Sequence, residues 1–408
     1  LGRGCRDPQS GEYRVCGPAF RDAAPDHLWL NDGNGGFVSA TLDYGNRADG
    51  YNRDPSRSQL QPPMLDSAVT GRGLAVLAAN LDSDPGIEVM VANDLSANHL
   101  WDTPQDVGSS AAPETFSMRN VALPRGVAVG ANGAAQAGMG IATDDLEGDG
   151  DLDLVVSNFS DESNNVYKQH ADGLFIDVSG RDGMREISLP FVGFGAVLGD
   201  FNRDGTRNLF LANGHVNMVG YESPDDAAPE SDKVDLRPYI QPAAVLQFRD
   251  GRWTKSQTGG TYFNRSHIGR AVASLDFDRS GTLDLAVTHT SEKFCLLSTK
   301  NPVGKPSNAM ISIRLVGRST QRAAVGSRVF VQTDKCKRTM HRVAGGSYMA
   351  SHTQQLSTGI SSSETLETIS VHWPCGEVQS LGKLELNCEW LIVQGTAPIV
   401  CGTYTNSN

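Results

Sequence analysis

One pattern recurs four times along the 408-residue chain and constrains its fold more than any other feature. A strand-like segment rich in glycine and other small residues leads into an acidic loop, and an apolar strand-like segment follows. The loops begin at Asn80, Asp145, Asp200 and Asp276, so successive copies lie 65, 55 and 76 residues apart. A repeat of this length accommodates one four-stranded sheet with variable loops, as in the blades of a β-propeller.

A second motif follows most of the loops and completes the unit. An apolar pair, a turn and then a glycine with an aromatic residue occur at residues 28–37, 165–175 and 245–253. Asp-Gly or Asn-Gly between apolar segments is a strong hairpin signal. Together the two motifs predict a strand, an acidic loop, a strand and a hairpin in each repeat. We therefore expect an all-β chain with a β-propeller as its main part.

The spacing of the oxygen-bearing side chains in each loop has a physical reason. Side chains at positions 1, 3 and 5 of a tight loop converge, a glycine near position 6 permits the reversal, and an oxygen at position 9 closes the cage. Hard oxygen ligands in an irregular cage suit Ca²⁺ better than Mg²⁺, which is the alternative at weaker sites. The predicted metal ligands are Asn80, Asp82, Asp84 and Glu88; Asp145, Glu147, Asp149 and Asp153; Asp200, Asn202, Asp204 and Asn208; and Asp276, Asp278, Ser280 and Asp284.

The number of acidic ligands ranks the four loops. The second loop has four acids, the first and fourth have three each, and the third has two, so we expect the second to bind most tightly and the third to be weak or empty. Strand-like flanks argue against an EF-hand, in which helices flank the loop. The alternative to an ion is an Asx-rich turn that needs none.

The pattern changes near residue 308. Alternating strand-like segments at 310–315, 327–332, 339–343, 368–372 and 390–393 are separated by turns without a metal loop, and they predict a compact β-sandwich or barrel. We expect a propeller over 1–300, a linker over 301–307, the β-domain over 308–395 and a tail over 396–408. The acidic stretch 216–239 is expected to be a surface loop on the third blade.

These repeats are similar to the FG-GAP or VCBS repeats of integrin α-subunit propellers. The chain resembles still more closely the cartilage acidic protein family with its C-terminal ASPIC/UnbV domain. The segments that carry the similarity span nearly the whole chain: 15–18, 137–140, 157–165, 212–215, 313–317, 324–327, 344–348 and 371–376. The resemblance implies a seven-bladed propeller with calcium at the blade loops, found outside cells and having binding or adhesive roles.

Two features depart from the family pattern. Four metal loops are visible, with a hairpin remnant at 28–37 before the first, so roughly two blades are missing, divergent or supplied by another chain. Ser280 stands at position 5 of the fourth loop, where the family usually has an acid. An open propeller exposes strand edges, which favour association unless they are covered. Because the chain begins with Leu1, we also expect a processed or incompletely represented N-terminus.

Charge and cysteine spacing limit the classes of partner and the cellular compartment to be considered. A net charge of −12 without a basic stripe argues against nucleic acid, and no apolar run approaches the ~18 residues that cross a bilayer. Sequons at Asn158 and Asn264 fit N-glycosylation. The seven cysteines lack a Cys-x-x-Cys pair, and free thiols are the alternative to bridges. Their spacing suggests local disulfides Cys5–Cys16, Cys388–Cys401 and Cys336–Cys375, with Cys295 unpaired.

Signatures of catalysis are scarce. We find no G-x-S-x-G elbow, P-loop, H-E-x-x-H or dinucleotide fingerprint. Several side chains allow a chemical interpretation as well as a structural one. His341, His352 and His372 could form a zinc site, and His215 and His289 could line a propeller face. Trp373 could bind sugar if it is exposed.

The leading hypothesis is a non-enzymatic binding or adhesion module, extracellular or at the cell surface, with the periplasm as an alternative. Ca²⁺ would stiffen its blades, and its partner would be a protein or a polysaccharide of the surface or matrix. One alternative is a structural subunit of a surface assembly or fibre, completed by strand exchange. Another is a polysaccharide hydrolase or lyase that uses the propeller funnel.

Overall fold

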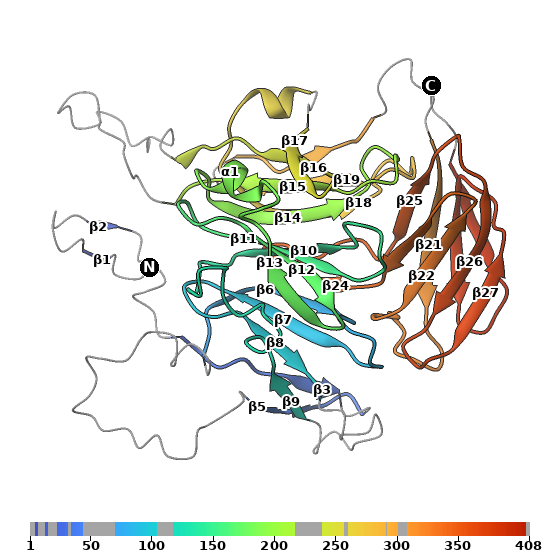
Figure 1. The fold of residues 1–408 in the computed structure, drawn as a ribbon, viewed down its shortest axis with the longest axis horizontal. Helices are drawn as coiled ribbons and strands as arrows, with labels where there is room; N and C mark the ends of the chain where they lie inside the picture. The colour runs from blue at the N-terminus through green and yellow to red at the C-terminus, as the bar shows by residue number, and fades with distance from the viewer. Residues whose placement is uncertain are drawn as a thin grey trace.

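The computed structural model describes residues 5–6, 13–14, 23–31, 34–43, 70–103, 117–216, 239–256, 260–290, 292–300 and 308–404. Their regular structure is nearly all antiparallel sheet. The helical elements among them are the five-residue helix α1 (Met184–Ser188) and a 3₁₀ turn (Thr261–Asn264). Figure 1 shows a stack of blade-like sheets with a separate sheet pair beside it. The predicted all-β class is confirmed.

Four consecutive sheets correspond to the four repeats, and in each the acidic loop joins the first strand to the second. The first blade contains β6 (Gly73–Ala79), β7 (Glu88–Asn93), β8 (His99–Asp102) and β9 (Ser117–Asn120). The second contains β10 (Gly140–Asp144), β11 (Asp153–Ser157), β12 (Asn165–Ala171) and β13 (Leu174–Asp177). The third contains β14 (Gly193–Gly199), β15 (Asn208–Asn213), β16 (Ala244–Arg249) and β17 (Arg252–Lys255). The fourth contains β18 (Gly269–Leu275), β19 (Asp284–His289) and β20 (Cys295–Leu297).

Small residues in the first strands let neighbouring blades approach closely. A Cβ on Gly140 would lie 2.2 Å from the carbonyl oxygen of Phe194 in the next blade. A Cβ on Gly195 would lie 2.6 Å from the backbone nitrogen of Val272 in the blade after that. Only glycine fits where two backbones come this close. The glycines of the repeat therefore set the spacing of the inner strands.

Apolar side chains from successive blades fill the space between them. One buried cluster joins the first two blades through residues such as Leu77 and Tyr167. A second joins the second and third blades around Leu209, and a third joins the third and fourth around Phe210. The apolar second strands β7, β11 and β15 thus supply core on both of their faces.

The N-terminal part contains the expected hairpin remnant. Strands β3 (Trp29–Asn31) and β4 (Phe37–Ser39) pair with each other, and β5 (Thr41–Asp43) joins the first blade beside β9 in parallel. Strands β1 (Cys5–Arg6) and β2 (Tyr13–Arg14) form a separate pair. The blades formed by the described residues do not close a ring.

The C-terminal residues form two four-stranded sheets that face each other across one core. The first has the order β25-β21-β28-β29 and the second β23-β22-β26-β27. Their bounds are β21 (Ala309–Val316), β22 (Arg328–Thr333), β23 (Lys337–His341), β25 (Leu356–Ile360), β26 (Leu366–His372), β27 (Val378–Gly382), β28 (Cys388–Val393) and β29 (Ile399–Thr403). This is the sandwich that the alternating segments indicated, and β29 lies within the segment expected to be a tail. The expected linker 301–307 and most of the loop 216–239 lie outside the described residues.

A segment of the sandwich, residues 344–353, reaches the inner strands of the blades; we call it the plug segment. Its strand β24 (Ala344–Gly345) pairs with β6, and Figure 1 shows β24 among the blades. The backbone N–H of Ser347 donates to Ile141 of the second blade (2.5 Å), and its Oγ donates to Val272 of the fourth (2.7 Å). The ring of Tyr348 packs edge-on against Phe194 of the third blade, 4.9 Å between centroids. The plug segment therefore contacts all four blades and covers the inner edge of β6.

Two predicted disulfides are wrong. Cys336 follows the end of β22 at which Thr333 pairs with Leu366, whereas Cys375 lies beyond the other end, where Arg328 pairs with His372. The sheet separates the two by at least four residues, or roughly 15 Å. Cys295, Cys336, Cys375, Cys388 and Cys401 are free.

The Cys388–Cys401 pairing fails because of strand register. Cys388 is buried and lies opposite Thr403, while Cys401 is exposed at an irregularity in the same ladder. Cys16 lies outside the described residues, so the Cys5–Cys16 bridge stays a prediction. No helix among the described residues has the length and apolar character needed to cross a membrane.

Candidate metal centres

The acidic loops share a backbone geometry that follows from their repeat. The carboxylate at position 9 accepts a hydrogen bond from the backbone nitrogen at position 2 in three loops: Leu81 to Glu88 (2.5 Å), Leu146 to Asp153 (3.2 Å) and Phe277 to Asp284 (3.0 Å). The carboxylate at position 1 accepts from the nitrogen of the glycine at position 6 in three: Gly150 to Asp145 (2.9 Å), Gly205 to Asp200 and Gly281 to Asp276 (both 3.0 Å). In the second and fourth loops, which have both bonds, the two ends of the loop are drawn toward one centre.

Positive φ angles at two positions produce the reversal that the sequence predicted. Position 6 has φ of 100° at Gly150, 80° at Gly205 and 82° at Gly281. Position 4 is also left-handed, with φ of 56° at both Arg203 and Arg279. A side chain in this region is strained, so two non-glycine residues held there indicate that the surrounding loop fixes the conformation.

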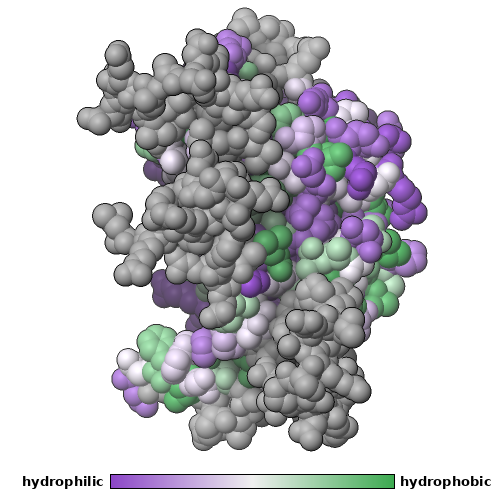
Figure 2. Space-filling view, turned by 90° about the vertical axis from the view of Figure 1, so that its left-hand side faces the viewer, coloured by the Kyte–Doolittle hydropathy of each residue, from purple (hydrophilic) through white to green (hydrophobic). Residues whose placement is uncertain are grey.

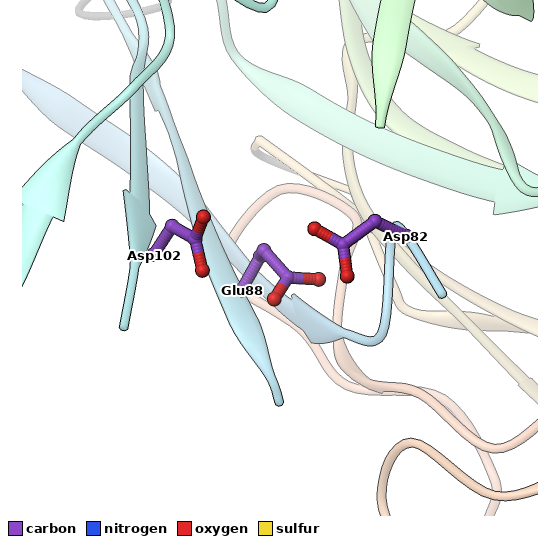
Figure 3. A group of neighbouring side chains, drawn as sticks. All are labelled: Asp82, Glu88 and Asp102. Carbon is purple, nitrogen blue, oxygen red and sulfur yellow. The ribbon is translucent and has the colours of Figure 1, made fainter. Parts of the chain in front are cut away.

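The first loop forms a three-carboxylate group that includes a residue the sequence did not single out. Figure 3 shows Asp82, Glu88 and Asp102 directed toward one another, and one oxygen of each lies within 4.8 Å of the others. Asp102 ends β8, whose Trp101 lies opposite Val89 of β7. An acid at the end of the third strand, beside the position-9 acid, is the signal that would have identified it.

A basic side chain already contacts the carboxylates of this first group. Arg125, in the turn after β9, places Nη2 2.6 Å from Oδ2 of Asp82 and 2.7 Å from Oδ2 of Asp102. Asn80 donates from Nδ2 to the carbonyls of Asp84 (2.6 Å) and Gly86. The carboxylate of Asp84 does not belong to the group.

The fourth loop brings its predicted acids together most directly. Carboxylate oxygens of Asp276, Asp278 and Asp284 lie within 4.8 Å of one another. Ser280 Oγ accepts from the nitrogen of Thr282 at 3.3 Å. No basic side chain forms an ion pair with these three acids among the described residues. The guanidinium of Arg203, from the third loop, donates instead to the carbonyl of Ser280 at 2.6 Å. A cation at this point would meet three carboxylates that no ion pair occupies, with the charge of Arg203 nearby.

The second and third loops are arranged differently. Their acids do not converge as such a group in the described part of the chain. Glu147 forms an ion pair with Lys168, and Asp149 accepts from the nitrogen of Asp151 at 3.0 Å. In the third loop, Asp204 pairs with Arg249 at 2.7 Å and accepts from Asn202 at 2.9 Å. A basic side chain therefore occupies one predicted ligand in each of these loops.

Three buried oxygens at predicted ligand positions have no hydrogen-bond donor. They are Oδ1 of Asn80, Oδ1 of Asn208 and Oδ1 of Asp276. The side chain of Asn208 is 4% exposed, so solvent does not satisfy it. A buried polar atom without a partner costs about 1–3 kcal/mol of folding free energy. A hard cation in each of the three loops would supply the missing partner. The donor sets present thus fit an oxygen-liganded ion.

Burial raises the pKa of several loop acids, whereas at Asp204 and Asp278 hydrogen bonds outweigh burial and lower the pKa. Desolvation, helped by the charge of Asp82, raises the pKa of Glu88 to about 8. Desolvation and Asp144 raise the pKa of Asp145 to about 7. Burial also raises the pKa of Asp276 and of Asp284. Without an added positive charge the carboxyls of Glu88 and Asp145 hold protons near neutral pH, whereas an ion would favour their charged forms.

The histidines considered for zinc do not form a ligand group in the described residues. His341 and His372 lie opposite Arg328 on either side of it, in strands β23 and β26. His352 instead accepts from the nitrogen of Ser274 in the fourth blade through Nδ1 (3.3 Å). The three side chains are thus divided between two structural settings.

The other singled-out side chains also have structural partners. Trp373 is 3% exposed and donates from Nε1 to Gln379. It therefore anchors the turn, in agreement with its structural interpretation. His289 lies 3.0 Å from the hydroxyl of Tyr262 through Nε2. His215 packs edge-on against Phe159, with 5.4 Å between ring centroids.

Comparison with known proteins agrees with the motifs. Residues 145–211 match the FG-GAP-like repeat, and residues 317–399 match the ASPIC and UnbV family. Cartilage acidic protein 1 of Xenopus tropicalis is 25% identical over 313 residues, covering 65% of this chain and 47% of that protein. Its counterpart in Mus musculus is 25% identical over 346 residues, covering 81% and 48%. The chain spans about half the length of these curated relatives. The resemblance expected from the motifs is confirmed.

Proposed function

We propose that this chain is a non-catalytic, extracellular binding module whose blade loops hold Ca²⁺. The observation that carries the proposal is the set of donorless buried oxygens on Asn80, Asn208 and Asp276, each at a ligand position of the repeat. The FG-GAP-like match over the second and third loops supports it, as does the similarity to cartilage acidic protein 1. A bound ion would join residues on both sides of each loop and so stiffen the blade.

The arrangement favours an order of affinity that differs from the count of acids. In the first three loops Arg125, Lys168 and Arg249 contact ligand carboxylates, and an ion must displace them. The acids of the fourth loop have no ion-pair partner in the part of the chain described, and the nearby Arg203 donates to the carbonyl of Ser280. We therefore propose that the fourth loop fills first, ahead of the second.

The partner we propose is a protein or polysaccharide of the cell surface or matrix. Its surface of contact includes the hairpin β3–β4, where Trp29 is 58% and Phe37 64% exposed. Large apolar side chains that remain this exposed are typical of interaction sites when they cluster. On the side of the molecule seen in Figure 2, the part that is not grey has hydrophobic residues in small areas separated by hydrophilic ones. This distribution favours a polar, reversible contact over an obligate one.

The enzymatic alternative receives little support from the centre of the blades. The plug segment lies against the inner strands, where a funnel would have to open, and Ser347 bonds to two of the blades there. The structural-subunit alternative has one observation in its favour. The fourth blade ends at β20 after three strands in the described residues, so its outer edge offers a place for an added strand.

Thermal unfolding in calcium and in EGTA tests the proposal. An ion that binds only the folded state stabilises by RT ln(1 + [L]/Kd), about 2.7 kcal/mol at a hundredfold excess. We expect the Tm to rise by several degrees in millimolar Ca²⁺ and less in Mg²⁺. Calorimetric titration should give a stoichiometry above one. An unchanged Tm together with no heat of binding would contradict the proposal. Light scattering of the same samples separates a monomeric module from a self-assembling subunit.

A further inference from the structure

All four cation loops lie against the C-terminal sandwich. In the first, a Cβ on Gly326 would lie 3.5 Å from Cβ of Asn80. In the second, a Cβ on Gly150 would lie 3.4 Å from Oγ1 of Thr339. Contacts of this kind at successive loops show that the sandwich covers the loop face of the blades.

The third loop makes the most direct contact. The backbone nitrogen of Gly359, in β25, donates to Oδ2 of Asp200 at 2.9 Å, and this oxygen also accepts from Gly205. Asn308 donates from Nδ2 to the carbonyl of Arg203 at 2.7 Å. Asp200 is 6% exposed. The carboxylate at position 1 of this loop therefore takes part in both the ion cage and the domain contact.

The fourth loop meets the same sheet of the sandwich, at strands β21 and β28. Arg279, held at positive φ, forms an ion pair with Glu389 at 3.6 Å. A Cβ on Gly281 would lie 2.2 Å from the sulfur of Met310 and 2.9 Å from the ring of Tyr404. The residues of this loop that touch the sandwich, at positions 4 and 6, lie next to the predicted ligands at positions 3 and 5.

We infer that the four loops are the docking surface for the chain's own C-terminal sandwich, and that ion occupancy and docking stabilise each other. The inference rests on the proposed ion binding and assigns its use. Asp200 links the two events, because its carboxylate accepts the N–H of Gly359 in the sandwich and also stands at position 1 of the ion cage. Arg207, which pairs with Asp144 as well, supplies part of the balancing charge for Asp200, and an ion would add to it. The plug segment then follows the sandwich into or out of its place at the inner strands.

This assignment distinguishes two roles for the ions. A coordination position offered to an outside partner would need ligands that face solvent, as Glu147, Asp149 and Asp278 do. Asn80 and Asp200, at position 1 of their loops, lie against sandwich residues instead. Through this side of the loops, the ions act on the position of the sandwich.

Hydrogen exchange of the intact wild-type chain tests the inference. The amides of Gly346 and Ser347 bond to Val76 and Ile141 of the blades, and that of Thr353 bonds to Ser274. We expect these amides to exchange about tenfold or more slowly in millimolar Ca²⁺ than in EGTA. The amide of Val331, in the middle of β22, reports on the sandwich alone and should change little. Equal exchange of the plug amides in both conditions, with calorimetry showing bound Ca²⁺, overturns the inference and leaves the proposed function intact. Absence of bound Ca²⁺ overturns both.

Two substitutions test the reverse direction of the coupling. A Cβ on Gly359 would lie 2.2 Å from the carbonyl oxygen of Arg203, so Gly359→Ala should push the sandwich away from the third loop. By linkage, Ca²⁺ affinity should fall about fivefold or more. Ser347→Ala, which removes the bond to Val272, should lower it in the same direction without strain in β25. Gly180→Ala is the matched control, because a Cβ there meets nothing within 4 Å. Wild-type affinity in Ser347→Ala and in a folded Gly359→Ala overturns the inference.

Discussion

The guanidinium of Arg125 lies 2.6 Å from the carboxylate of Asp82, 43 residues earlier in the chain, and contacts Asp102 with the same nitrogen. The first loop thus carries its own positive charge when no ion is present. Lys168 beside Glu147 and Arg249 beside Asp204 repeat this arrangement in the next two loops. A basic side chain and a divalent ion compete for the same carboxylates, so each loop has two ways to balance its charge.

Replacing the arginine should make the first loop depend on calcium. In Arg125→Gln, Asp82 and Asp102 lose their common partner, and the metal-free protein should lose about 2 kcal/mol or more of unfolding free energy. Calcium should restore most of this loss because the ion takes the place of the guanidinium. Chemical denaturation in EGTA and in Ca²⁺ measures both values.

Arg181→Gln serves as the control for that experiment. Arg181 is exposed and lies outside the first loop, and its replacement changes the net charge by the same amount as Arg125→Gln. Its stability should stay within about 0.5 kcal/mol of the wild type in both conditions. If Ca²⁺ failed to recover Arg125→Gln, the arginine would be a purely structural ion-pair partner.

Asn208→Leu should have effects of opposite sign with and without calcium. In the metal-free protein, the substitution removes a buried oxygen that has no donor, and stability should stay equal or rise by about 1 kcal/mol. In Ca²⁺ it removes a ligand, so the calcium-induced rise in Tm should shrink. Asn208→Asp is the companion variant, and it should bind Ca²⁺ more tightly than the wild type. Parallel melting curves for all three proteins would show that this oxygen does not bind an ion.

The raised pKa values predict how stability depends on pH. The pKa of Glu88 is about 8 in the folded chain against an ordinary 4.5, and that of Asp145 is about 7 against 3.8. At pH values between the ordinary and the raised pKa of each group, the folded state holds more protons than the unfolded state. The metal-free protein should therefore lose stability as pH rises, by at most about 1.4 kcal/mol per pH unit for each group. Calcium binds the deprotonated carboxylates, so the Tm difference between calcium-loaded and metal-free protein should widen from pH 5 to pH 8. Glu88→Gln should flatten part of this trend, and a difference independent of pH would contradict the assignment.

The local pattern of the sequence was enough to predict the blades. Acidic loops at regular intervals and Asp-Gly hairpins place β10 to β13 and β14 to β17 within a few residues of their observed positions, because each blade is formed by neighbouring segments. Asp102 and Arg125 could not be found this way. They reach Asp82 through strand pairing and a turn at least 20 residues distant, and a lone Asp or Arg carries no periodic signal.

Long-range placement also explains the larger surprises. The stretch 344–348 was recognised as a family motif, yet nothing in its composition indicates that it pairs with β6, more than 250 residues earlier. The cysteine pairs failed for the same reason, since spacing along the chain does not reveal that Cys336 and Cys375 lie beyond opposite ends of a sheet. Counting acids ranked the second loop first because Lys168, a strand away, was not visible as a competitor of Glu147.

The order in which the loops fill can be settled with three single substitutions. Asp278→Asn removes an acid from the loop whose acids have no ion-pair partner in the described residues, so it should abolish the tightest phase of a Ca²⁺ titration, whereas Glu147→Gln should leave that phase unchanged. Lys168→Met frees Glu147 and should raise the Ca²⁺ affinity of the second loop by about two- to tenfold. The ion then no longer has to break a partly exposed ion pair of about 0.5–1 kcal/mol, and one charge that repels it is gone. Terbium luminescence and calorimetry can follow each phase. If Glu147→Gln removed the tightest phase instead, the count of acids would determine affinity and the competing lysine would be without effect.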